Sequence, residues 1–215
     1  MRADLDEWLR LREGIAHRAD ILRAGYAVAT MRRFVRDGPA RVIRRAWVTL
    51  PDAAPDLVTA ATAGGRISCV SVARRRGWWV PPGLDPHPHL HLVPGSGSAR
   101  LPEGWLGRLH WTMPLAPQGR SLTTTVEDAL AHIAVCVPHD AALVLWESAV
   151  RVEGLAPESL RRIRWTTRVA RELAAELTLR GYTVLRVSYV QIVHDWPSVE
   201  RRIRSAIAAR LHLAS

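Results

Sequence analysis

The sequence predicts a mixed α/β (α+β) protein with an N-terminal helix-turn-helix and wing, a mixed middle domain and a C-terminal strand-helix segment. Apolar residues recur at helical spacing near the N-terminus, and short β-branched runs separated by Gly and Pro follow. Tyr182 to Val190 is a β-branched and aromatic run directly after Gly181, a helix stop. We therefore expect three domains, at residues 1–50, 51–165 and 166–215.

The first fifty residues have the pattern of three helices and a hairpin. Apolar residues between Leu5 and Leu11 predict the first helix, and residues 17–24 predict the second. Thr30 is expected to cap a third helix, whose apolar residues face inward while its arginines point outward. Residues 41–50 then predict a two-stranded basic wing.

Shorter elements are expected in the middle of the chain. Thr124 and Glu127 have the spacing of a capping box, which predicts a helix directly after them. The other elements expected here are a helix at 57–63, a strand running into a helix at 67–72, strands at 89–93 and 109–113, and helices beginning at Asp140 and Pro157.

The C-terminal stretch carries the most specific pattern of the chain. Asp195 is placed to accept hydrogen bonds from the first turn of a closing helix, where Pro197 is tolerated. Residues 180–207 resemble the last strand and helix of the very-short-patch-repair-like endonuclease domain, which has a restriction-endonuclease-like fold. Residues 1–50 resemble the AbiEi-type winged helix that is often fused to that domain in actinobacteria. The chain departs from the usual Arg-Gly-Val-Tyr ending of that wing, with Arg-Ala-Trp-Val at 45–48.

The resemblance implies metal-dependent cleavage by an Asp on one strand and a Glu-x-(Asp/Glu/Lys) on the next. Family members carry these acids where this chain has only residues 160–170, which contain no acid, and the chain has no lysine. Glu172 and Glu176 lie one turn apart and are expected to form a solvated helix face. We therefore expect no catalytic residue. The alternative is a metal-dependent endonuclease of this fold, and it requires a catalytic segment between Arg164 and Arg171.

The charge of the chain favours a polyanionic partner. Thirty basic residues, all of them arginine, outweigh twenty acidic residues and give a net charge of +10. Six arginines but only one acid, Asp37, lie between positions 31 and 45. Arginines on a recognition helix can read guanine edges, and wing arginines can meet phosphates. The DNA-binding residues expected are Thr30, Arg32, Arg33, Arg36, Arg41, Arg44 and Arg45.

Histidines and cysteines are expected to be structural. His87, His89 and His91 alternate, so a strand would place them on one face, but no nearby acid or cysteine in the sequence completes a metal shell. A half-exposed strand face is the favoured interpretation. Cys69 and Cys136 are expected to be buried thiols, so neither a metal site nor a cofactor is expected.

Two further patterns have an alternative reading. His194 and Asp195 could form an acid–base pair, but a turn and a helix cap are the favoured roles. Trp78, Trp79 and Trp146 are expected to anchor the core and not to stack on bases.

These observations predict a DNA-binding transcription regulator, antitoxin-like, in a toxin–antitoxin or phage-defence locus. Its expected partners are double-stranded DNA and either a protein toxin or a second copy of the chain. A third reading is an interaction module that binds a toxin through the middle domain and uses DNA only for autoregulation. No apolar run is long enough to span a bilayer, so no membrane partner and a cytoplasmic location are expected.

Overall fold

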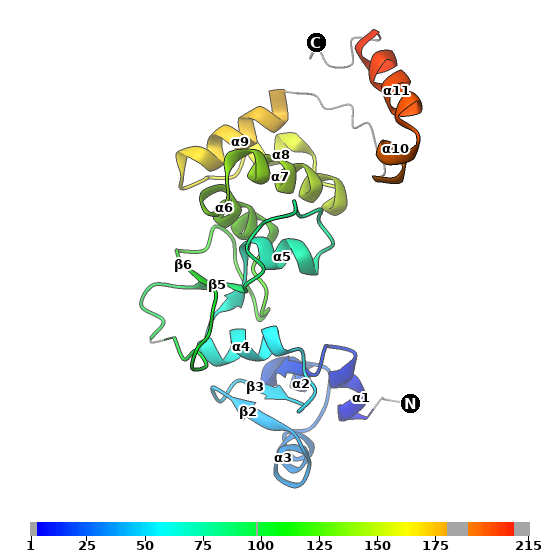
Figure 1. The fold of residues 1–215 in the computed structure, drawn as a ribbon. Coiled ribbons are helices and arrows are strands. Elements are labelled where there is room, and N and C mark those ends of the chain that lie inside the picture. Colours follow the sequence, from blue (N-terminus) through cyan, green and yellow to red (C-terminus); the bar gives the residue numbers. More distant parts are fainter. Residues whose placement is uncertain (1–3, 98, 180–188, 209–215) are drawn as a thin grey trace.

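The computed structural model describes residues 4–97, 99–179 and 189–208, which form a mixed helix and sheet protein of the predicted α/β class (Figure 1). The N-terminal unit contains α1 (Leu5–Arg10), β1 (Ile15–His17), α2 (Arg18–Arg23), α3 (Val28–Asp37), β2 (Arg41–Ile43) and β3 (Trp47–Thr49). Its three strands are antiparallel and lie in the order β1-β3-β2. We call the hairpin of β2 and β3 the wing, because it follows the helix pair α2-α3 as the sequence predicts.

A small core holds the N-terminal unit together. Leu5 and Leu9 on α1, Ile21 on α2, Met31 on α3 and Val48 on β3 are all buried in one cluster. Each helix contributes the apolar face expected from its spacing, which leaves the opposite face of α3 in solvent.

The start of α3 differs from the prediction. The helix begins at Val28, with Ala27 in the cap position and no side-chain cap hydrogen bond. Thr30 therefore lies inside the first turn, with an exposed side chain, and the expected cap at Thr30 is wrong. Alanine is the best helix former, so Ala29 favours a helix that begins before Thr30.

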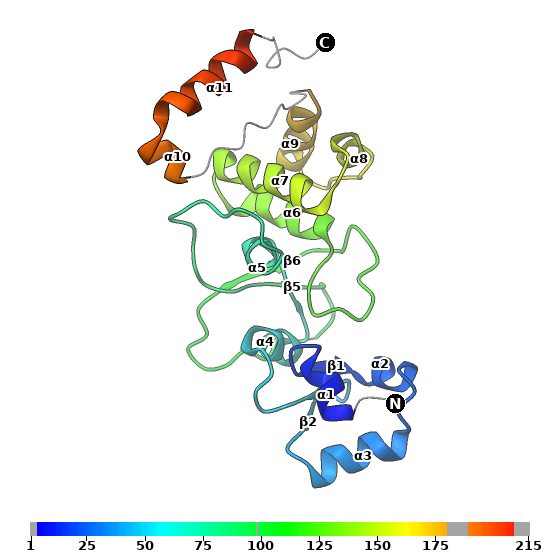
Figure 2. The same cartoon turned by 90° about the vertical axis from the view of Figure 1, so that its right-hand side faces the viewer.

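The middle unit combines a small sheet with a layer of helices (Figure 2). The order of its strands is β4-β5-β6, with β4 antiparallel and β6 parallel to the central β5. Because β5 has a neighbour on both sides, it offers no free edge. The elements are α4 (Pro55–Ala63), β4 (Arg66–Ile67), α5 (Cys69–Arg75), β5 (His89–Leu92), β6 (Arg108–Trp111), α6 (Val126–Cys136), α7 (His139–Glu153), α8 (Pro157–Arg161) and α9 (Arg168–Leu179).

The core of this unit runs from the sheet through α9. Trp146 is fully buried, donates its indole N–H to the Leu130 carbonyl at 3.1 Å, and lies 4.9 Å from the Trp165 ring. Trp78 is also buried, but Trp79 is 54% exposed, so the expected role as a core anchor is wrong for Trp79 alone. Buried residues of α9 belong to the same core, so this helix packs with the middle unit.

The cap of α6 lies one residue later than the sequence predicts. The Thr125 hydroxyl accepts a hydrogen bond from the backbone N–H of Asp128, and the Asp128 carboxylate accepts one from that hydroxyl. Thr124 is unavailable because its backbone N–H donates to the Ile67 carbonyl and its hydroxyl donates to Ser68. The predicted box of Thr124 and Glu127 is therefore wrong by one position.

Two helices close the described part of the chain, α10 (Tyr189–His194) and α11 (Trp196–Ala208). The end of the predicted strand, Tyr189 and Val190, is helical, and the rest of that strand lies outside the described residues. The backbone N–H of Ser198 donates to the Asp195 carboxylate at 3.4 Å, which confirms Asp195 as the cap of the closing helix. Across the described ranges, no helix combines the length and the apolar character needed to cross a membrane.

Candidate nucleic-acid interface and buried Cys/His cluster

The outer face of α3 presents unpaired positive charge. Arg32 and Arg33 are exposed, and neither makes a side-chain hydrogen bond or ion pair with the described residues. Arg36 instead donates two hydrogen bonds, of 2.6 and 2.8 Å, to the Asp37 carboxylate. These bonds lower the pKa of Asp37. Exposed pairs of this kind contribute little to stability, so Arg36 can exchange this partner for a phosphate at small cost.

The turn of the wing places two arginines in the left-handed region. Arg44 and Arg45 have φ of 47° and 58°, and the Ala46 N–H donates to the Ile43 carbonyl at 3.0 Å. Two consecutive positive φ values match the twist of a hairpin, but residues with a Cβ at these positions cost about 1 kcal/mol each. Two arginines directly before Ala46 therefore occupy the left-handed positions of this turn.

The side chain of Arg44 turns toward the middle unit. Its Nε and Nη2 donate to the carbonyls of Thr62 and Ala63, at 2.9 and 3.1 Å. These carbonyls belong to the last turn of α4, where a cation compensates the helix dipole. Arg44, for which a phosphate contact was expected, thus makes a structural contact with α4. Arg45 and Arg41 remain exposed, and their side chains make no hydrogen bond with the described residues.

A groove of about 230 Å³ separates α3 from the wing. Its floor is apolar and its edges are basic. Arg18, at one edge, donates to the backbone carbonyl of Arg45 at 3.0 Å and so ties α2 to the wing. The residues around the groove are Arg18, Met31, Arg32, Val35, Arg36, Val42 and Val48.

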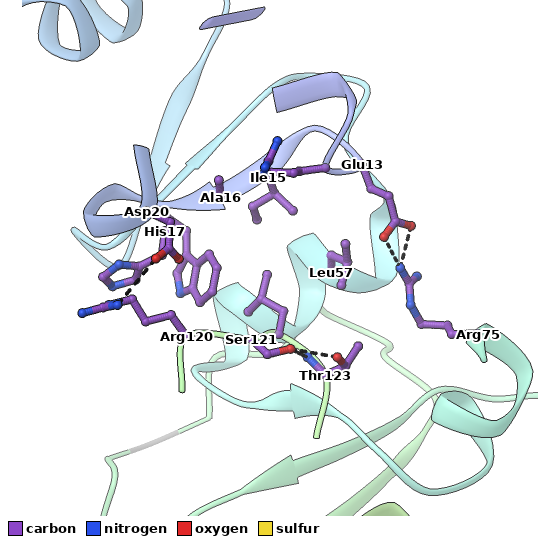
Figure 3. Close-up of a pocket in the computed structure, with 13 residues that line it drawn as sticks. Glu13, Ile15, Ala16, His17, Asp20, Leu57, Arg75, Arg120, Ser121 and Thr123 are labelled. Carbon is purple, nitrogen blue, oxygen red and sulfur yellow. Dashed lines mark hydrogen bonds and ion pairs between the residues drawn. The ribbon is translucent and has the colours of Figure 1, made fainter. Parts of the chain in front are cut away.

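Polar contacts hold the N-terminal unit against the middle unit. Figure 3 shows the pocket of about 300 Å³ between them, where Arg75 reaches across to Glu13. Arg75 lies 2.5 Å from that carboxylate and 2.6 Å from Asp56, and Arg120 lies 3.5 Å from Asp20. Arg75 and Arg120 are therefore paired with acids of the N-terminal unit, and these contacts fix the orientation of the unit that carries α3.

The alternating histidines are not a half-exposed face. His89 and His91 are 2% and 1% exposed, whereas His87 is exposed and contacts Asp85 at 2.6 Å. The expected half-exposed strand face is therefore wrong for the two histidines within β5. These two side chains point into the middle unit, where Thr112 and other histidines surround them.

Two cysteines complete this buried cluster. Cys69, His89, His110 and Cys136 bring their Sγ and ring nitrogen atoms to within 4.8 Å of one another. The expectation that no cysteine approaches the histidines is wrong, because the ligands come from α5, β5, β6 and α6. Sequence reasoning missed His110 and the pairing of the cysteines, since no local spacing links positions 69 and 136.

The two acids considered for catalysis differ in exposure. Glu172 is 52% exposed and binds Arg168 at 2.6 Å, in agreement with a solvated helix face, whereas Glu176 is only 23% exposed and contacts His139 at 3.3 Å. No protein-family model matches the chain, and no curated protein matches it either.

Proposed function

We propose that the N-terminal unit binds duplex DNA, with α3 in the major groove and the wing against the backbone. The observation that carries this proposal is the pair Arg32 and Arg33 on the solvent face of α3, with no acid bound to either. Arg41 and Arg45 extend the same basic surface onto the wing, which suits phosphate contacts.

The packing of the unit supports this orientation. A recognition helix must be held rigidly while its outer face stays free. Met31 anchors α3 in the core, Arg18 ties α2 to the wing, and Arg44 ties the wing to α4. The excess of basic residues over the whole chain adds a favourable long-range field.

Fluorescence anisotropy of a labelled mixed-sequence duplex tests the proposal over a series of salt concentrations. The parent protein should bind with an affinity that falls linearly with salt on a double logarithmic plot. Replacing Arg41 and Arg45 with Ala should flatten that slope by up to about 2, because each phosphate contact contributes about 0.9. Replacing Arg32 and Arg33 should weaken binding and abolish sequence enrichment from a randomised duplex pool.

A matched control removes the same charge elsewhere. Arg151 on α7 and Arg161 on α8 are exposed and make no side-chain hydrogen bond with the described residues. Their double Ala variant should bind like the parent. If it weakens binding as much as the α3 and wing variants do, or if the parent fails to bind at low salt, the proposed interface is wrong.

The wider role we propose is an antitoxin-like transcription regulator in a toxin–antitoxin or phage-defence locus. The resemblance of residues 1–50 to the AbiEi-type winged helix supports this role, together with the basic surface described above. A protein toxin or a second copy of the chain would be the protein partner. Co-expression with the neighbouring reading frame, followed by purification and an operator-binding assay, tests it. A neighbouring product that neither binds the chain nor changes its DNA affinity would contradict this role.

A further inference from the structure

Four potential metal ligands from separate elements meet inside the middle unit. Cys69 is the first residue of α5 and Cys136 is the last of α6, while His89 and His110 lie on the parallel strands β5 and β6. Cys69, His89 and His110 are buried and Cys136 is partly buried. Figure 2 shows α5 beside these strands and α6 over them.

Two of the separations between the ligand atoms match the edges of a tetrahedral shell. Zn–N and Zn–S bonds of about 2.1 and 2.3 Å predict tetrahedral edges of about 3.4 Å for N···N and about 3.6 Å for N···S. The His110 Nε2 to His89 Nδ1 distance is 3.4 Å, and the Cys136 Sγ to His89 Nδ1 distance is 3.6 Å. Both distances fit edges of a tetrahedron around a common ion.

The backbone at Cys69, one of the four ligands, is strained. Its φ of 54° is in the left-handed region, which residues with a Cβ seldom occupy outside functional sites.

A second layer of side chains orients one of the ligands. The His132 ring stacks on His110, with centroids 4.5 Å apart and planes at 14°. His132 is fixed in turn by the hydroxyls of Ser68 at 2.6 Å and Thr112 at 2.8 Å.

We propose that Cys69, His89, His110 and Cys136 bind one Zn²⁺ ion in a closed, structural tetrahedral site. Two thiolates and two imidazoles are a donor set that selects Zn²⁺ over harder cations, and four protein ligands leave no open position for catalysis. The ion would join α5, β5, β6 and α6 in a unit whose strands are only two to four residues long. Its binding energy would then contribute directly to folding.

The metal content of the full chain is the primary test, and it needs no variant. Protein purified without chelator should carry about one zinc per chain by elemental analysis. After removal of zinc under reducing conditions, Co²⁺ should produce the visible absorption of a tetrahedral thiolate site, and Zn²⁺ should abolish it. The zinc-free protein should melt at a lower temperature, and added Zn²⁺ should restore the melting temperature.

Variants distinguish the proposed site from other occupants of the cluster. Cys136→Ser and His110→Gln should both lose the stoichiometric zinc, whereas His87→Gln, an exposed histidine of the same loop region, should retain it. A disulfide between the cysteines would give an intact mass two hydrogen atoms lower, without zinc, and would overturn the proposal. Free thiols with neither zinc nor a tetrahedral Co²⁺ spectrum would also overturn it.

Discussion

Asp128 should be the acid whose loss destabilises the middle unit most clearly. Its carboxylate is 1% exposed and accepts hydrogen bonds from the Leu115 backbone N–H at 2.8 Å, the Gln118 side-chain amide and the Thr125 hydroxyl at 2.9 Å. It therefore joins the loop before α6 to the first turn of that helix. The perturbation is Asp128→Ala.

The expected loss follows from the three bonds and from the burial of the carboxylate. Hydrogen bonds to a charged group contribute roughly 1.5–3 kcal/mol each, and an N–H left unsatisfied in a buried site costs about 1–3 kcal/mol. Relief of the desolvation of the carboxylate offsets part of this cost. We expect the free energy of unfolding to fall by about 3 kcal/mol, and Asp128→Asn to lose about half as much because one acceptor oxygen remains.

Glu127→Ala is the matched control, since it removes the same charge from the same helical turn. Glu127 is only partly buried, so its loss should cost about 0.5 kcal/mol through the helix dipole alone. Urea unfolding, followed by far-ultraviolet circular dichroism and tryptophan fluorescence, measures both variants. If Asp128→Ala and Glu127→Ala differ by less than about 1 kcal/mol, the carboxylate does not hold the loop and the reasoning from its hydrogen bonds fails.

Three further outcomes are expected. Arg44→Ala should lower the free energy of unfolding by about 1 kcal/mol because it removes the two hydrogen bonds to the last turn of α4. Arg45→Ala, at a similar φ and with the same change of charge, should not lower it. Equal melting temperatures of the two variants would contradict this prediction. Gly14→Ala should lower the free energy of unfolding by more than about 2 kcal/mol, because the new Cβ would lie 2.7 Å from the Cα of Ala53. Gly83→Ala has a similar positive φ but open space around it, so it should lower that free energy by only about 1 kcal/mol. Urea unfolding measures both. The hydrogen bond from Arg76 lowers the pKa of Glu153 in the folded state. The ionised Glu153 therefore stabilises the fold above the ordinary pKa of a glutamate, and this stabilisation is lost as the pH falls through the lowered pKa of the folded state. The melting temperature should therefore fall less steeply below about pH 5 in Glu153→Gln than in the parent, and parallel curves would exclude this role.

Local signals in the sequence were enough to place most elements. Helical spacing of apolar residues locates α1, α2 and α3, and alternating or β-branched runs locate β5 and β6 within a few residues. The cap at Asp195 was also predictable, because a capping side chain bonds to its own neighbours in sequence. The predicted tail strand is wrong at Tyr189 and Val190, which lie in α10. The β propensity of these two residues did not decide their structure, because that propensity depends strongly on context.

Contacts between distant segments decided the chemistry. Thr125 caps α6 because Thr124 makes hydrogen bonds to Ile67 and Ser68. The side chain of Arg44, expected to contact DNA, makes a hydrogen bond to the end of α4, because that end lies against the wing. Cys69 and Cys136 are separated in sequence by β5 and β6, yet folding places both beside His89. The sequence alone determined most of the helices and strands and the basic character of α3, because those depend mainly on residues within one or two turns. Only tertiary structure could assemble the four-ligand cluster, because its members come from four elements whose packing no local pattern specifies.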